Sequence, residues 1–129
     1  MEEKYNEATI NRPEGDRPVD APLVLIDIAS FIKQIKNERA WEENDRNSIT
    51  VFKSDKLRIV IVALHKKAEM TTEHPRNILS IQMIKGKIKL FADGKTIIVE
   101  EEQLFVLHEN ISYKIEAIKK AIFILTITE

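Results

Sequence analysis

The side chains best suited to chemistry in this 129-residue sequence are its three histidines, His65, His74 and His108. An imidazole can ligate a transition metal or exchange a proton near neutral pH. Cysteine is absent, which excludes disulfides, thiolate nucleophiles and cysteine-based zinc sites. His74 lies between Glu73 and Pro75, so we expect it where a loop enters a strand. It could serve as a metal ligand or a polar anchor in a cavity, or simply hydrogen-bond to the backbone.

Other catalytic patterns are missing from the sequence. Its three glycines, Gly15, Gly86 and Gly94, cannot form a glycine-rich phosphate loop. There is no Ser-His-Asp order with a nucleophile-elbow context, and no close pair of inward carboxylates suggests glycosidase chemistry. The run 100–102 of three glutamates could attract a cation, but a solvated turn is the better interpretation.

The composition is that of a soluble globular protein, with 43% hydrophobic and 32% charged residues. A net charge of −1 gives no reason to expect binding to nucleic acid or to acidic membranes. The N-terminus has no basic start and no apolar run, so we expect no secretory signal. The absence of cysteine fits a reducing cytoplasm, where we expect the protein to reside.

The length favours one domain, preceded by a tail. Residues 1–21 are polar and contain two prolines, so we expect them to be a flexible tail. Within the single domain over 22–129, residues 22–47 are expected to supply a strand and a helix. Residues 48–128 are expected to supply the β-structure.

The helix is predicted over residues 28–38. Asp27 can cap its N-terminus, and a strand candidate at 23–26 precedes it. Four apolar residues follow the spacing of one helical face: Ile28, Phe31, Ile32 and Ile35. Trp41, just beyond, either stacks on a ligand, packs the helix end on the β-structure or lies at a dimer contact.

From residue 48 onward the pattern is that of β-strands. Eight short segments are rich in Ile, Val, Phe and Thr: 49–53, 57–64, 78–84, 87–92, 96–99, 104–107, 112–118 and 121–128. Gly86 marks one turn, and Asp93-Gly94 supplies the positive φ angles of a tight hairpin. Eight strands without intervening helices predict an all-β, antiparallel sandwich or barrel.

Two of these strands, over 59–64 and 121–125, are apolar along their whole length. Such runs are typical of strands that are covered on both faces. In a chain with so few strands, one face of these strands must be covered either by another subunit or by the N-terminal helix. We therefore expect a homodimer.

The order of these parts resembles the cupin superfamily, and in particular small single-domain RmlC-like cupins of unassigned function. The segment 72–86, with Glu73-His74-Pro75 before a strand and the Gly86 turn, resembles the first cupin motif. The segment 104–113 resembles the second. The resemblance covers about residues 48–128. It implies an antiparallel jelly-roll β-barrel with a short N-terminal helix packed on it.

The resemblance also implies where metal ligands would lie. A metal-binding cupin uses three imidazoles and one carboxylate or amide, a set that suits iron, manganese, nickel or zinc. The motifs place these ligands at Thr72, His74, Leu79 and Tyr113. Leucine cannot ligate, threonine ligates poorly, and the phenol pKa of about 10 argues against tyrosine. Only His74 remains, so the expected cofactor is none, with a divalent transition metal as the alternative.

The same placement implies a small apolar cavity. We expect it to be lined by Thr72, His74, Leu79, Ile81, Met83, Phe105 and Tyr113. The Tyr113 hydroxyl either faces this cavity or reaches the surface. His65 is expected in solvent or at a mouth of the barrel, and His108 at a turn.

Three functions remain open at this point. The first is a metal-free binding module for a small, mostly apolar molecule. The second is a degenerate dioxygenase or isomerase that assembles a site from His74, Tyr113 and a third group such as His65 or Glu73. The third is a structural or partner-binding role for the tail or for the helix face.

Overall fold

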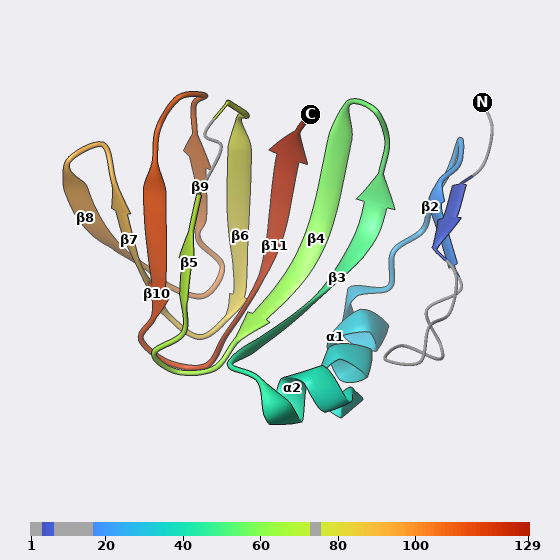
Figure 1. Cartoon of the computed structure of the whole chain (residues 1–129), viewed down its shortest axis with the longest axis horizontal. Coiled ribbons are helices and arrows are strands. Elements are labelled where there is room, and N and C mark those ends of the chain that lie inside the picture. Colours follow the sequence, from blue (N-terminus) through green and yellow to red (C-terminus); the bar gives the residue numbers. More distant parts are fainter. Residues whose placement is uncertain (1–3, 7–16, 73–75) are drawn as a thin grey trace.

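A computed structural model of the chain shows a mostly β molecule with two short helices (Figure 1). It describes residues 4–6, 17–72 and 76–129. The helices are α1 (Ile28–Asn37) and α2 (Arg39–Glu43). The strands are β1 (Lys4–Asn6), β2 (Arg17–Asp20), β3 (Arg46–Lys53), β4 (Leu57–Leu64), β5 (Glu69–Thr71), β6 (Leu79–Lys85), β7 (Ile88–Ala92), β8 (Lys95–Val99), β9 (Leu104–Leu107), β10 (Tyr113–Ala117) and β11 (Ala121–Thr128).

Two antiparallel sheets make up the body of the fold. The five-stranded sheet has the order β3-β4-β11-β6-β9, and the four-stranded sheet has the order β5-β10-β7-β8. A separate pair joins β1 to β2. The predicted antiparallel all-β class is confirmed.

The two sheets pack face to face over an apolar interior, the inner cluster. The five-stranded sheet contributes alternate residues such as Val62, Ile81 and Phe123, and the four-stranded sheet contributes residues such as Leu90 and Ile115. Each of these side chains is almost completely buried. Because side chains alternate along a strand, their neighbours must point to the outer faces of the two sheets.

The outer face of the five-stranded sheet has its own apolar group, the outer cluster. Ile35 of α1 and Trp41 of α2 are buried there with Ile49, Ile61 and Ile122 of the sheet. One polar residue ties the helix layer to the sheet: the buried Asn47 amide donates to the Ile35 carbonyl and to Glu38 Oε1, at 3.0 Å each. The runs 59–64 and 121–125 are apolar because they face both clusters.

Local signals explain the start of α1. Asp27 caps it by accepting from the Ser30 backbone N–H at 3.2 Å and from the Ser30 hydroxyl at 2.8 Å. These bonds hold the pKa of Asp27 below its usual value. The predicted cap is therefore confirmed, and α1 ends one residue earlier than expected.

The strand predicted at 23–26 is wrong. The segment 21–27 is irregular, and Leu23 and Leu25 are 86% and 92% exposed. Although the sequence of this segment is typical of a strand, no strand among the described residues pairs with it. In the expected tail, β1 and β2 form a pair, and the domain boundary at residue 22 stays a prediction.

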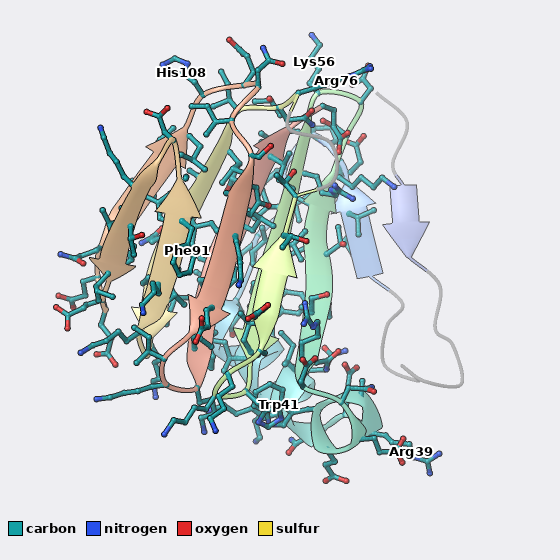
Figure 2. The ribbon with its side chains drawn as sticks, turned by 60° about the vertical axis from the view of Figure 1, so that its left-hand side comes forward. Arg39, Trp41, Lys56, Arg76, Phe91 and His108 are labelled. Atoms are coloured by element: carbon teal, nitrogen blue, oxygen red, sulfur yellow. The ribbon has the colours of Figure 1, made fainter. Side chains whose placement is uncertain are left out.

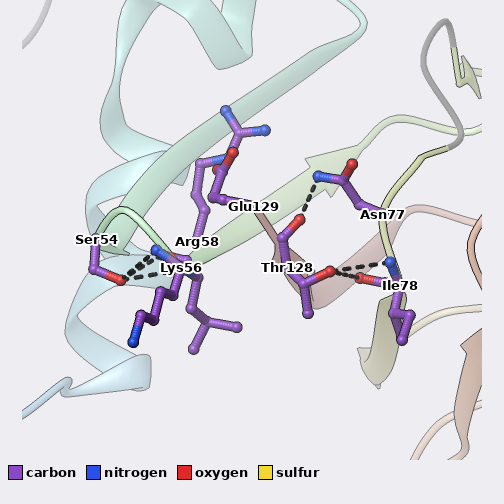
Figure 3. Close-up of polar contacts among 8 residues, drawn as sticks. Ser54, Lys56, Arg58, Asn77, Ile78, Thr128 and Glu129 are labelled. Carbon is purple, nitrogen blue, oxygen red and sulfur yellow. Dashed lines mark hydrogen bonds and ion pairs between the residues drawn. The ribbon is translucent and has the colours of Figure 1, made fainter.

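Polar contacts fix the C-terminal end of β11, the central strand of the five-stranded sheet (Figure 3). The Ile78 N–H donates to Thr128 Oγ1 at 3.1 Å, and the Asn77 amide donates to the Thr128 carbonyl. Arg58 pairs with Glu129 at 3.4 Å. These contacts join the start of β4 and the residues just before β6 to the end of β11. None of the helices in the described ranges is long and apolar enough to cross a membrane.

Two glycines in tight turns make different demands on the backbone. Gly86 has a φ of +87°, and a Cβ there would lie 2.0 Å from the Lys120 carbonyl oxygen. Gly94 has a φ of +69° with nothing within 4 Å of an added Cβ. With Asp93, also at positive φ, it forms the predicted two-residue hairpin between Ala92 and Lys95.

We therefore expect Gly86→Ala to lower the free energy of unfolding by about 3 kcal/mol or more, because left-handed strain adds to a backbone clash. Gly94→Ala, which keeps the strain without the clash, should cost about 1 kcal/mol. Urea denaturation monitored by circular dichroism measures both. Equal losses for the two variants would contradict the close packing of Gly86 on Lys120.

Candidate functional site

Two connections between strands meet at one end of the molecule, the end that is uppermost in Figure 1. There β7 and β9 end while β8 and β10 begin, so the β7–β8 hairpin and the β9–β10 connection lie at the same end (Figure 1). The register brings Leu79 beside Leu107 and Tyr113 beside Ala92. We call this region the loop end.

The structure brings most of the sequence-predicted pocket residues together between the sheets. Leu79, Ile81 and Met83 are buried in the inner cluster, and Phe105 and Tyr113 pack against it half-buried. The half-buried Thr72 donates its backbone N–H to the Tyr113 carbonyl at 3.2 Å. His74, like Glu73, lies outside the described residues. That these residues bind a ligand stays a prediction.

Tyr113 has the most perturbed environment of this group. Burial raises the pKa of its phenol, because the charged phenolate would be poorly solvated there. The hydroxyl therefore stays protonated at neutral pH and can donate a hydrogen bond. A protonated phenol is a poor metal ligand.

A pocket of about 250 Å³ opens at the loop end between the edge strands of the two sheets. Its lining comes from the β7–β8 hairpin, from β9 and from the connection after β9: Leu90, Ala92, Asp93, Lys95, Ile97, Val106, Leu107, His108 and Ile111. Six of these nine side chains are apolar. Asp93, Lys95 and His108 are exposed at the rim. The pocket is thus a mostly apolar space with polar groups of both charge types at its entrance.

Sequence reasoning missed this pocket, although it noted both turns that flank it. The Asp93-Gly94 hairpin and the turn at His108 are more than ten residues apart in the chain. Only the pairing of the strands sets them at one end of the fold. One feature of the sequence could have indicated the pocket: Ile97 is an apolar residue on a short strand next to a hairpin.

His65 lies at the opposite end of the molecule. His65 follows β4, and the loop after His65 contacts Ala117. Ala117 is the last residue of β10, whereas Tyr113 is the first. The length of β10 places Ala117 about 13 Å from Tyr113. His65 therefore cannot join Tyr113 in a metal site, which corrects one expectation from the sequence.

His65 instead packs on Trp41. Their ring centroids are 3.5 Å apart, the rings are 16° from parallel, and His65 Nε2 lies 2.8 Å from the Trp41 carbonyl oxygen. Trp41 is buried in the outer cluster. Of the roles considered for Trp41, packing of the helix end on the sheet is the one that these contacts support.

The glutamate run also acts structurally. Glu100 pairs with Lys87 at 3.2 Å, and Glu101 accepts from the Gly86 N–H at 3.2 Å. All three glutamates are exposed. They form the solvated turn before β9.

The described residues do not fit a bound metal ion. Across 4–6, 17–72 and 76–129, no group of three or more histidine, aspartate or glutamate side chains could hold one. At the expected ligand positions, Leu79 is buried and apolar and Tyr113 is protonated.

Comparisons with known proteins identify the fold. No family model matches the sequence, and neither does any curated protein. A cupin 2 conserved barrel domain protein from Leptotrichia buccalis is similar in structure, at 19% identity and a TM-score of 0.68, over 81% of this chain and 50% of that one.

Two further solved structures are similar. The cupin domain of Cnp3 from Schizosaccharomyces pombe is 17% identical, with a TM-score of 0.61, over 100% of this chain and 89% of that one. KdgF from Halomonas sp. is 15% identical, with a TM-score of 0.61, over 65% of this chain and 78% of that one. At such identities the likeness shows the fold alone.

The raised pKa of Tyr113 predicts a pH dependence of stability. The folded state keeps the phenol proton to a higher pH than the unfolded state, whose phenol pKa is about 10. Tyr113 therefore contributes stability below about pH 10, and this contribution is lost as the pH rises through the folded-state pKa. As the pH rises above about 10, urea denaturation should show the wild type losing stability more steeply than Tyr113→Phe. Parallel pH profiles would contradict the burial of the hydroxyl.

Proposed function

We propose that this chain, which has the fold of the cupin superfamily, is a metal-free module that binds a small, mostly apolar molecule at its loop end. The observation that carries this proposal is the pocket between the edge strands β8 and β9. Loops on a rigid β-scaffold are common places for binding sites. The proposal concerns binding and includes no chemical step.

The size and lining of the pocket support a small ligand. Its volume of about 250 Å³ lies just below the range of about 300–1,000 Å³ typical of pockets for drug-sized molecules. Leu90, Ile97 and Leu107 offer apolar walls. Burial of an apolar body against such walls supplies affinity.

The rim supplies polar groups that could orient a ligand. Lys95 and His108 can donate hydrogen bonds, and Asp93 can accept one. A ligand with an apolar body and one polar end would place that end at the rim. Because the charged groups at the rim are exposed, water hydrates them when the pocket is empty. Leaving them without a ligand therefore costs little free energy.

The pocket adjoins the cavity that the sequence predicts. Leu107 and Ala92 line the pocket, and their strand partners are Leu79 and Tyr113. We propose that Leu79 and Tyr113, together with Thr72 and His74, form the inner wall of one binding space, and that Ile81, Met83 and Phe105 pack beneath it. We also propose that the two sheets close into a jelly-roll barrel whose opening lies between β8 and β9.

A matched pair of variants tests where the ligand binds. Ile97 and Ile98 are neighbours on β8, 45% and 46% exposed, but only Ile97 lines the pocket. A compound at 100 times its Kd should stabilise the protein by about 2.7 kcal/mol and raise Tm by several degrees. Ile97→Trp should abolish this shift by filling the pocket, whereas Ile98→Trp should keep it.

The screen uses a panel of small apolar carboxylic acids, alcohols and amines, with Tm measured by calorimetry in the presence of a chelator. Failure of every compound to raise Tm would contradict the proposal. So would a shift that survives in Ile97→Trp, because the ligand would then bind elsewhere.

Metal content distinguishes this proposal from a metal-dependent enzyme. Protein purified without chelator should carry less than about 0.1 equivalent of iron, manganese, nickel or zinc, because His74 alone cannot hold an ion tightly. Elemental analysis of the wild type and of His74→Ala measures this. Near-stoichiometric metal that is lost in His74→Ala would contradict metal-free binding.

A further inference from the structure

The end of the molecule opposite the loop end carries several lysines that have no part in the pocket. Trp41 lies at this end in Figure 2, whereas His108 lies at the loop end. Here β6 turns into β7 through Gly86, and β10 turns into β11 through residues 118–120. We call this region the turn end.

Backbone contacts hold the two turns of the turn end side by side. The Ile118 N–H donates to the Lys87 carbonyl at 2.9 Å, and Gly86 lies directly against the Lys120 carbonyl. Lys85 is the strand neighbour of Ile122, which follows Lys120 by two residues. Lys85 and Lys120 are therefore neighbours in the fold, although they are far apart in the chain.

The last turn of α1 adds Lys36 to this group. Burial, and then repulsion from the ammonium groups of Lys120 and Lys85, lowers the pKa of Lys36. Both of these lysines thus lie close enough to Lys36 to repel its charge. Lys119, which is exposed beside Lys120, adds a fourth positive charge. We call Lys36, Lys85, Lys119 and Lys120 the lysine cluster.

No carboxylate neutralises the lysine cluster in the part of the chain that the structure describes. The neighbouring Lys87 pairs with Glu100 at 3.2 Å, but none of the four cluster lysines belongs to an ion pair there. Like charges that lie close together without a counter-charge raise the free energy of the folded state. An anion bound among the four lysines would remove this cost.

Acidic side chains near the lysine cluster limit the size of an anion that can bind. Glu100 and Glu101 lie in the turn before β9, and Glu100 already holds Lys87. Beyond α1, the short helix α2 carries the exposed Glu42 and Glu43. An extended polyanion, such as a nucleic acid or an anionic membrane, would bring negative charge over these glutamates. A compact anion with several charges avoids that repulsion.

We propose that the lysine cluster binds a compact ligand with several phosphate groups. A lysine ammonium binds phosphate as a point charge. Four ammonium groups can offset most of the charge of two or three phosphates, because a phosphate monoester carries about −1.5 to −2 at pH 7. Nucleoside triphosphates and inositol polyphosphates share this chemistry. The site and the pocket lie at opposite ends of the molecule, so either can exist without the other.

The test is isothermal titration calorimetry of the full chain with sodium tripolyphosphate, at an ionic strength of about 0.01 M. The wild type should bind one tripolyphosphate per chain, more tightly than it binds inorganic phosphate, and added salt should weaken the binding. Lys85→Gln/Lys120→Gln should raise Kd at least about tenfold, since two charge-assisted contacts are lost. Circular dichroism confirms that each variant is folded.

Lys53→Gln/Lys56→Gln is the matched control. It also removes two exposed lysines, and Lys56 lies at the end of the molecule opposite Trp41 (Figure 2). This variant should bind tripolyphosphate as the wild type does. A wild type that does not bind tripolyphosphate would overturn the proposal. So would an equal loss of affinity in the two double variants, because the whole charge of the chain would then be responsible.

Further titrations identify the kind of ligand. Adenosine triphosphate and inositol hexakisphosphate carry clustered phosphates on different bodies, and the proposal expects at least one of them to bind through the same lysines. The one that binds more tightly identifies the source of the phosphates. Suppose instead that a single-stranded oligonucleotide, or vesicles of phosphatidylserine and phosphatidylcholine, binds more tightly than any of these compact anions and loses affinity in Lys85→Gln/Lys120→Gln. An extended polyanion would then be the partner, and the proposal would be wrong.

Discussion

The structure depends on one constraint, which is that the five-stranded sheet is apolar on both faces. Its central strands β4 and β11 alternate between residues such as Val62, which face the other sheet, and residues such as Ile61, which face the helices. Each buried side chain of this size contributes about 1.5–3 kcal/mol only if water is excluded from it. Both faces therefore need a cover, and the arrangement of the remaining elements follows from that need.

The inner cover is the four-stranded sheet, and it leaves little free space between the sheets. Leu79, Ile81 and Met83, which the sequence predicts to line a cavity, are packed in the inner cluster. Open space occurs where the packing ends, between the edge strands β8 and β9 at the loop end. The outer cover is the helix layer, which is too short to reach β9. The pocket thus lies where the cover of the inner face of the five-stranded sheet stops.

The strands, the turns and the helix cap could be predicted from the sequence because their signals are local. Alternation identified β7 and β10, positive-φ residues marked the Asp93-Gly94 hairpin, and Asp27 marked the start of α1. The strand predicted at 23–26 failed because β-propensity does not provide a pairing partner. The pocket was missed because its walls come from two edges that only the tertiary fold sets opposite each other. The position of His65, at the far end from Tyr113, depends on strand direction in the same way.

NMR spectroscopy of the ¹⁵N-labelled protein can show at once whether the loop end binds a small apolar molecule. The measurement is the change in backbone amide shifts as a compound that raises Tm is titrated in. If the ligand binds there, the largest changes should fall on the residues around the pocket, from Leu90 to Ile97 and from Val106 to Ile111. Shift changes that concentrate on the helices or on the outer face of the four-stranded sheet, with the loop end unaffected, would contradict binding at the loop end.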